Sequence, residues 1–114
     1  MPELRIIVST EARADLLALE QYITEHDGPM RAELILSRIE GVVRTLAFMP
    51  GLGRPRAFLE RGTRAFPIAP WLIVYALLPK RDGIRVIRIL DGRRDLARIL
   101  GRRRRVPRKR QQQR

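Results

Sequence analysis

The sequence predicts an α+β fold with a helical hairpin packed on a mostly antiparallel sheet, in the element order β-α-α-β-β-β-α. Three observations predict it. A short β-branched run opens the chain, and two segments with apolar residues at every third or fourth position follow. Three β-prone runs separated by turn residues come next. Spacings of three and four are typical of one helix face, whereas short β-branched runs between turns are typical of strands.

The first strand and the first helix are predicted at the start of the chain. Residues 4–8 are mostly β-branched, and Pro2 and Ser9 bound them. Ser9 or Thr10 is a suitable N-cap, and Glu11 suits the positive end of a helix dipole. The apolar positions at spacings of four, three and four are Ala12, Leu16, Leu19 and Ile23.

A second helix follows after a very short turn. Gly28 can adopt the left-handed conformation that ends a helix, and Pro29 can begin the next one. The apolar positions that repeat at three and four are Ala32, Ile35, Ile39, Val42 and Leu46. The Pro-Gly-Leu-Gly segment at 50–53 ends this helix. Because the turn is so short, the two helices must be antiparallel neighbours.

The second half of the chain is predicted to be mainly strands. The expected elements are strands at 63–68, 71–78 and 84–90 and a final helix at 93–100. Pro67 has no backbone N–H, which places the first of these strands at a sheet edge. The Asp82-Gly83 pair is typical of a hairpin turn. Tyr22 and Tyr75 are expected in the core, and Trp71 is expected to be a core or edge anchor.

The charge of the chain is divided unevenly. The net charge is +12, made up of −3 over residues 1–53, +7 over 54–100 and +8 over 101–114. This asymmetry indicates an anionic partner, such as nucleic acid or an acidic protein segment. We expect one domain at 1–100 and a disordered basic tail at 101–114, because the tail has too little apolar surface to offset its ordering entropy.

Several classes of protein are excluded or disfavoured by composition. The chain has no cysteine, which excludes disulfide scaffolds, iron–sulfur sites and cysteine-based zinc sites. With His26 as the one histidine, we expect no metal site and no cofactor. The longest apolar run, 70–79, is about half of the ~20 residues that a membrane-spanning helix needs. We therefore expect a cytoplasmic protein with no membrane partner.

Four groups of residues carry a family resemblance. They are Ala12-x-x-Asp15-Leu16 with Tyr22-Ile23; Ala47-x-x-Pro50-x-x-Gly53-Arg54; Leu59-x-x-Gly62-x-Arg64 with Ile73-Val74-Tyr75; and the run from Ile84 to Asp95. Each group is weak alone, but their ordered set over residues 4–100 resembles the ParE branch of the RelE/ParE toxin superfamily. One departure is that Asp91-Gly92 stands where the family often has His-Gly before the final Arg-Asp.

The resemblance implies a RelE/ParE-like fold and a toxin of a type II toxin–antitoxin, or plasmid stabilisation, system. It also implies a hetero-oligomer with a ParD-like antitoxin that neutralises the toxin. ParE-type toxins are described as inhibiting DNA gyrase, so the resemblance implies that the free toxin binds and inhibits gyrase, whereas RelE-type toxins cleave mRNA in the ribosome. Because the fold is shared, the site must decide between these targets. A RelE-like mRNA interferase is the first alternative, and a basic nucleic-acid-binding protein is the second.

RNA cleavage needs a base, an acid and a group that stabilises phosphorane charge. An arginine could supply only the third, because its pKa above ~12 makes it a poor base. His26 lies next to the end of the first helix, where a cap or surface role is expected. The second helix has no lysine, and the tail has no tyrosine or histidine. We therefore expect no catalytic residue and a protein that is not an enzyme, with weak endonuclease activity left open.

The expected sites are for binding. The residues expected to contact the antitoxin or the target are Arg54, Arg56, Arg61, Arg64, Arg88, Arg93 and Arg94. Arg88 lies in an apolar strand, so we expect a structural ion pair with Asp95 or Asp91. Non-specific contacts to nucleic acid are expected from Arg102, Arg103, Arg104, Arg105, Arg108, Lys109 and Arg110.

The two helices should present an acidic outer face, made by Glu20, Glu25, Glu33 and Glu40. A partly acidic, amphipathic antitoxin segment is expected to dock across the helical hairpin and the sheet edge. It would become ordered as it binds, with its apolar side chains in grooves and its carboxylates on arginine.

Overall fold

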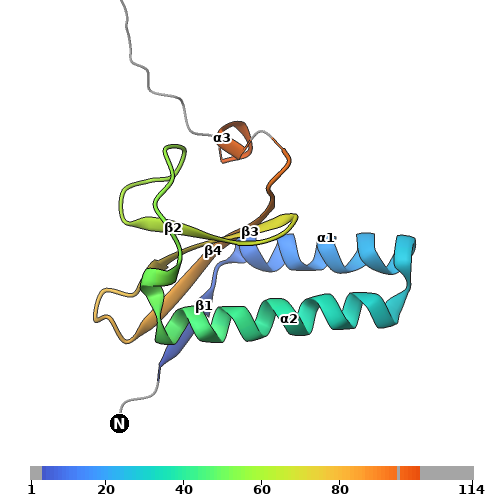
Figure 1. Cartoon of the computed structure of the whole chain (residues 1–114), viewed down its shortest axis with the longest axis horizontal. Helices are drawn as coiled ribbons and strands as arrows, with labels where there is room; N and C mark the ends of the chain where they lie inside the picture. Colours follow the sequence, from blue (N-terminus) through green and yellow to red (C-terminus); the bar gives the residue numbers. More distant parts are fainter. Residues whose placement is uncertain (1–3, 95, 101–114) are drawn as a thin grey trace, which may run out of the picture.

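The computed structural model describes residues 4–94 and 96–100. It has a four-stranded sheet with two long antiparallel helices on one face (Figure 1). The elements are β1 (Arg5–Val8), α1 (Thr10–Asp27), α2 (Pro29–Phe48), a 3₁₀ turn η1 (Pro50–Leu52), β2 (Thr63–Ile68), β3 (Trp71–Leu77), β4 (Gly83–Asp91) and α3 (Leu96–Ile99). The predicted order and fold class are confirmed.

The sheet has the strand order β1-β4-β3-β2. β1 pairs with β4 in parallel, whereas β4–β3 and β3–β2 are antiparallel, so the expected mostly antiparallel sheet is confirmed. β2 lies at an edge, as its Pro67 predicted. The Ala69–Pro70 peptide bond in the β2–β3 turn is cis.

The helix ends follow the capping residues in the sequence. Ser9 is the N-cap of α1, and its hydroxyl accepts a 3.0 Å hydrogen bond from the Ala12 N–H. Gly28 separates the two helices with a φ of 92°, a conformation that favours glycine, and its N–H donates to the Thr24 carbonyl. One serine therefore marks the start of α1, and one glycine separates the two helices.

Two apolar clusters lie on the two faces of the sheet. Ile73 and Tyr75 belong to the cluster formed with α1 and α2, whereas their neighbours Leu72 and Val74 belong to the other. This alternation is expected for a strand buried on both faces. The second cluster is covered by the loop between η1 and β2 and by α3. Its members beyond the strands include Leu59, Leu96 and the half-buried Phe58, Ile99 and Leu100.

The structure corrects four details of the predicted packing. The Tyr22 side chain is 59% exposed rather than in the core. In α2 Val43 is buried while Val42 is half-buried, and in α1 Leu16 is half-buried. α3 spans only Leu96–Ile99, so Arg93 and Arg94 precede the helix instead of opening it. Tyr75, by contrast, is fully buried as predicted.

A bulge interrupts the alternation in β4. Val74 pairs with Arg88 and Tyr75 pairs with Val86, which leaves Ile87 without a partner across the strand. Ile84, Val86 and Ile89 all contribute to the helix-side core, although their numbers differ in parity. A period of two does not hold from Ile84 through Ile89, because the extra residue shifts the side chains that follow it.

Among the described residues, no helix is both long and apolar enough to cross a membrane.

Candidate binding site

An apolar groove runs between the helical pair and the β1–β4 side of the sheet. Its volume is about 520 Å³, and its apolar lining residues are Ile6, Val8, Leu16, Leu17, Leu36, Ile39, Val43, Val86 and Ile89. Glu20, Glu40 and Arg44 supply its polar rim, where Arg44 donates a 3.0 Å hydrogen bond to Glu40. The groove thus combines an open apolar floor with a sparsely charged rim.

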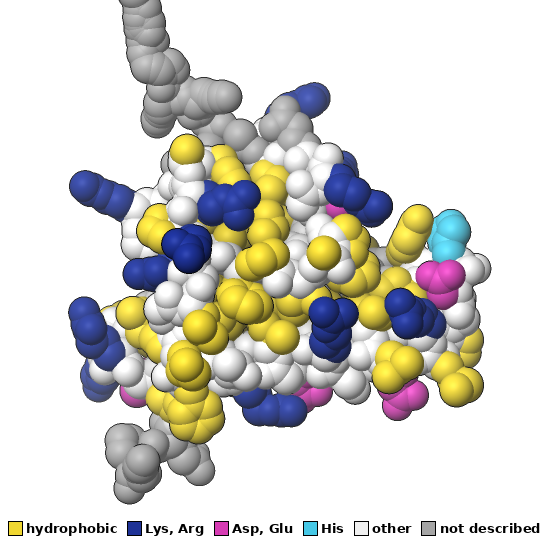
Figure 2. All heavy atoms as spheres, viewed as in Figure 1, with side chains coloured by type: hydrophobic (Ala, Val, Ile, Leu, Met, Phe, Trp, Pro, Cys, Tyr) yellow, Lys and Arg dark blue, Asp and Glu magenta, His cyan; other side chains and the backbone are white. Residues whose placement is uncertain are grey.

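Figure 2 shows how charge is arranged around the apolar surface. Lys and Arg side chains are scattered over the sheet, its loops and the helices, while most acidic side chains visible on this face lie along the helices. The four glutamates expected on the outer helix face are all exposed. Four arginines of the same helices, Arg13, Arg31, Arg38 and Arg44, are exposed as well, so the acidic outer face stays a prediction.

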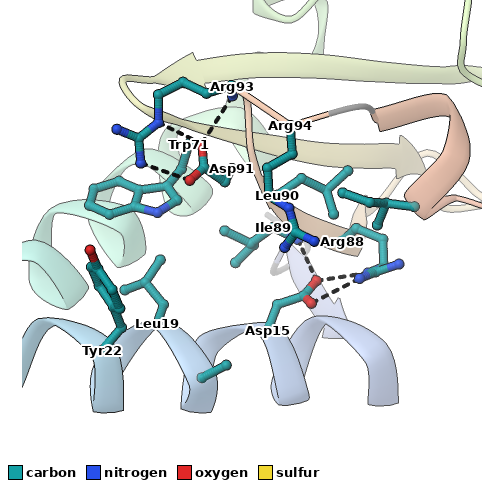
Figure 3. Close-up of a pocket in the computed structure, with 12 residues that line it drawn as sticks. Asp15, Leu19, Tyr22, Trp71, Arg88, Ile89, Leu90, Asp91, Arg93 and Arg94 are labelled. Atoms are coloured by element: carbon teal, nitrogen blue, oxygen red, sulfur yellow. Dashed lines mark hydrogen bonds and ion pairs between the residues drawn. The ribbon is translucent and has the colours of Figure 1, made fainter.

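A second pocket, called here the arginine pocket, lies between α1 and the end of β4 (Figure 3). Its volume is about 440 Å³. It is lined by Asp15, Ala18, Leu19, Tyr22, Trp71, Arg88, Ile89, Leu90, Asp91, Arg93, Arg94 and Ile99. Three of the seven arginines expected to bind a partner therefore share one pocket, together with two aromatic side chains.

Arg88 is held by Asp15. The Arg88 Nε and Nη2 atoms donate to the two Asp15 carboxylate oxygens at 2.8 and 3.0 Å, and the Ile89 N–H donates to Asp15 at 2.8 Å. The Asp15 hydrogen bond raises the pKa of the Arg88 guanidinium, against the opposite effect of burial. Both side chains are largely buried, so this bidentate pair joins α1 to β4.

The prediction that Asp91 pairs with Arg88 is wrong. Asp91 binds Arg93 instead, through Nε at 2.9 Å, Nη2 at 2.8 Å and the backbone N–H at 3.0 Å. These bonds lower the pKa of Asp91 to about 2. Asp95 lies outside the described residues. Among those that are described, Arg88 is paired with Asp15 and Asp91 with Arg93.

Arg64 has a structural contact in the same sheet. Its Nη1 donates to the Gly53 carbonyl at 2.6 Å, while the Gly53 N–H donates to the buried Tyr75 hydroxyl at 2.8 Å. That hydroxyl donates in turn to the Pro50 carbonyl at 2.7 Å. Burial raises the pKa of Tyr75. Arg64 and Tyr75 therefore fix the segment after α2, and two of the four groups behind the family resemblance meet here.

The other predicted arginines lie apart from the arginine pocket. Arg54 forms a backbone bridge with Ala65 of β2, with both hydrogen bonds at 2.9 Å, and its side chain is exposed. The Arg56 guanidinium lies 5.5 Å from the Phe58 ring centroid. Arg61 is exposed in the same loop. The seven arginines thus form two groups, one near β2 and one at the end of β4, and the predicted tail residues lie outside the described part.

Sequence reasoning missed Asp15, Tyr22 and Leu17 as site residues. Asp15 belongs to the first group of the family resemblance, but its spacing from Arg88 gave no sign of a contact. Tyr22 stacks on His26 with ring centroids 4.1 Å apart, a pair at helical spacing i,i+4 that was visible in the sequence. Leu17 falls off the buried stripe of α1 and is as exposed as Leu34, so its sequence position alone gave no sign of the groove that it lines.

Two groups capable of acid–base chemistry, Tyr75 and His26, line neither the groove nor the arginine pocket. The Tyr75 hydroxyl is buried with a partner on each side, and the His26 ring lies 2.8 Å from the Tyr22 carbonyl at the exposed end of α1. Over residues 4–94 and 96–100, no cluster of three His, Cys, Asp or Glu side chains is placed to hold a metal ion. The arrangement is suited to binding a chain through apolar contacts and guanidinium groups.

Comparison with known proteins gives concordant matches. The model of the family described as "ParE toxin of type II toxin-antitoxin system, parDE" matches residues 6–96. Toxin ParE3 of Caulobacter vibrioides is 37% identical over 97 residues, which cover 85% of this chain and 95% of that protein. A solved structure of a chromosomal ParDE system from P. aeruginosa matches with a TM-score of 0.63 at 23% identity, covering 75% of this chain and 92% of that one. Since the family model and the ParE3 match each span most of the chain, the chain belongs to the ParE toxin family of type II toxin–antitoxin systems.

Proposed function

We propose that this ParE-family toxin is neutralised by a ParD-like antitoxin and inhibits DNA gyrase when it is free. The observation that supports antitoxin binding best is the apolar groove between the helices and β1. An apolar surface rimmed by polar residues is typical of a protein-interaction site. A gyrase target would place the protein in the cytoplasm.

The groove suits an amphipathic segment of the antitoxin. Leu17 is 63% exposed, and Ile6 also reaches solvent, so both contribute to its open side. A helix laid into such a groove places apolar side chains at spacings of three and four against it. The solved ParDE system with a similar fold supports a partner of this class. With a net charge of +12, the toxin would capture an acidic antitoxin quickly, and capture would be slowed by salt.

Antitoxin binding is tested with two matched leucine variants. Leu17 and Leu34 are each 63% exposed on a helix, but only Leu17 lines the groove. With the antitoxin encoded beside this gene, Leu17→Glu should weaken binding by at least tenfold, because it places an unpaired charge against an apolar partner surface. The affinity of Leu34→Glu for the antitoxin should stay within twofold of that of the parent protein. Equal affinities of the two variants would contradict the assignment of the groove.

Gyrase inhibition is supported by the family and by the state of the acid–base groups. Tyr75 is the most deeply buried residue considered as a general base. Its pKa is raised, and its hydroxyl already accepts one hydrogen bond and donates another within the protein, which suits a structural residue better than a general base. Plasmid DNA isolated after the toxin is induced should lose negative supercoils, and co-expression of the antitoxin should prevent the loss. Intact supercoiling together with cleaved mRNA would instead identify a ribosome-dependent interferase.

A further inference from the structure

The arginine pocket has an unequal balance of charge. Three arginines and two aspartates line it, so the described lining has one positive charge in excess. Asp15 is occupied by Arg88 and by the Ile89 N–H, and Asp91 is occupied by Arg93. No described residue bonds to the Arg94 side chain, which extends into the pocket in Figure 3. Arg94 is therefore the guanidinium available to a ligand.

One wall of the pocket is aromatic and apolar. Tyr22 and Leu19 of α1 lie below Trp71, which lies beside the Asp91–Arg93 pair at the end of the pocket away from Arg88 (Figure 3). One excess positive charge beside such a wall matches a single carboxylate carried next to an apolar group. A phosphate dianion would leave a negative charge uncompensated beside two existing carboxylates, which disfavours it. The ligand chemistry indicated is an acidic side chain with an apolar neighbour.

The arginine pocket and the apolar groove lie on opposite sides of α1. Ala18 and Tyr22 line the pocket, whereas Leu17 and Glu20 line the groove. Because successive helical residues are rotated by about 100°, these two pairs point in nearly opposite directions. Ile89 of β4 lines both cavities. A chain that leaves the groove and passes around half of a helix about 10 Å wide needs about five extended residues to reach the pocket.

We propose that the antitoxin uses both cavities, crossing α1 to place a carboxylate on Arg94 and an apolar side chain against Trp71. This inference rests on the proposed function, because it extends the antitoxin contact from the groove to the arginine pocket. It assigns Arg94 and Trp71 to antitoxin recognition and leaves Arg88 and Arg93 as residues that are already paired within the toxin. Charge-assisted contacts of this type give specificity in addition to affinity.

The test is the affinity of the full-length toxin for the antitoxin encoded beside its gene, measured by calorimetry. Arg94→Gln should weaken binding about tenfold, since a hydrogen bond to a charged group is lost. Arg94→Glu should weaken it further by repulsion. The matched control is Arg31→Gln, because Arg31 is an exposed arginine that lines neither cavity. Thermal unfolding checks that each variant is folded, which is expected because Arg94 is exposed.

A second readout comes from the one tryptophan in the chain. In toxin labelled with ¹⁵N-tryptophan, the single indole N–H signal belongs to Trp71 and should shift when unlabelled antitoxin is added. The shift should shrink in the Arg94→Glu variant. If antitoxin binds the parent tightly but both Arg94 variants bind like Arg31→Gln and the indole signal stays in place, the proposed crossing is wrong while the groove assignment stands. If the parent does not bind the antitoxin, both proposals fail.

Discussion

Arg88 and Asp15, separated by 73 positions in the chain, form a bidentate ion pair that joins β4 to α1. The same carboxylate also accepts the Ile89 N–H, and the Ser9 hydroxyl donates to the Ile87 carbonyl at 2.7 Å. β1 ends at Val8, opposite Val86, so the β4 edge beyond that point has no strand beside it. Side chains from the start of α1 therefore satisfy backbone groups that a longer β1 would have paired.

Removing the carboxylate should destabilise the fold. Asp15→Ala leaves the Arg88 guanidinium without its partner, on a side chain only 22% exposed, and leaves the Ile89 N–H unpaired. We expect the free energy of unfolding to fall by about 2–3 kcal/mol, measured by urea denaturation. The control is Glu40→Ala, which removes the exposed i,i+4 pair with Arg44 and should change stability by less than about 0.5 kcal/mol. Equal effects of the two variants would contradict a structural role for Asp15.

Gly53 should not tolerate a side chain. A Cβ at this position would overlap the buried Tyr75 hydroxyl and ring, although the Gly53 φ of −76° is open to any residue. Gly53→Ala should therefore lower the free energy of unfolding by about 1–3 kcal/mol through overpacking. Gly51, where a Cβ would meet no atom within 4 Å, provides the control. Gly51→Ala should lie within about 0.5 kcal/mol of the parent, and a Gly53→Ala protein of parental stability would refute the account.

The carboxyl group of Asp91 should titrate at low pH because of Arg93. Its pKa of about 2 lies below the usual value, so this pair stabilises the fold above about pH 4 and the contribution is lost as pH falls towards 2. Arg93→Gln should raise the pKa of Asp91 towards ~3.9, measured by NMR titration. Arg94→Gln should raise it less, because Arg94 acts only through its charge. If the pKa of Asp91 is unchanged in Arg93→Gln, a group other than Arg93 lowers it.

Truncation after Leu100 should separate two kinds of binding. It removes eight positive charges and no acidic one. We expect non-specific affinity for duplex DNA to fall at least tenfold at low salt, with a shallower dependence on salt concentration. Affinity for the antitoxin should stay within threefold of the full chain. Loss of toxicity and of antitoxin binding together would favour the alternative of a nucleic-acid-binding protein.

Much of the fold could be predicted because the local sequence patterns favour the same helices and strands that the complete fold contains. The spacing from Ala12 to Ile23, the Ser9 cap and the Gly28-Pro29 break each specify the helical hairpin without distant contacts. Pro67 likewise identified an edge strand from its missing N–H.

The parts that escaped prediction depend on tertiary geometry. The bulge at Ile87 alters the side-chain alternation of β4, and no residue type in that run indicates it. The partner of Arg88 is set by where α1 crosses the free edge of β4, which sequence separation does not encode. Tyr22 lies near the apolar stripe of α1, but its side chain is exposed and lines the arginine pocket instead of the core. The sequence identified the candidate arginines, but it did not show which of them are already paired with an aspartate within the protein.

The most direct measurement is supercoiling of relaxed plasmid by purified DNA gyrase with increasing amounts of this toxin. Our account predicts that supercoiling is inhibited in proportion to free toxin and is restored by one equivalent of antitoxin per toxin-binding site. Undiminished supercoiling at a toxin excess that stops bacterial growth, with mRNA cleaved during translation, would contradict it.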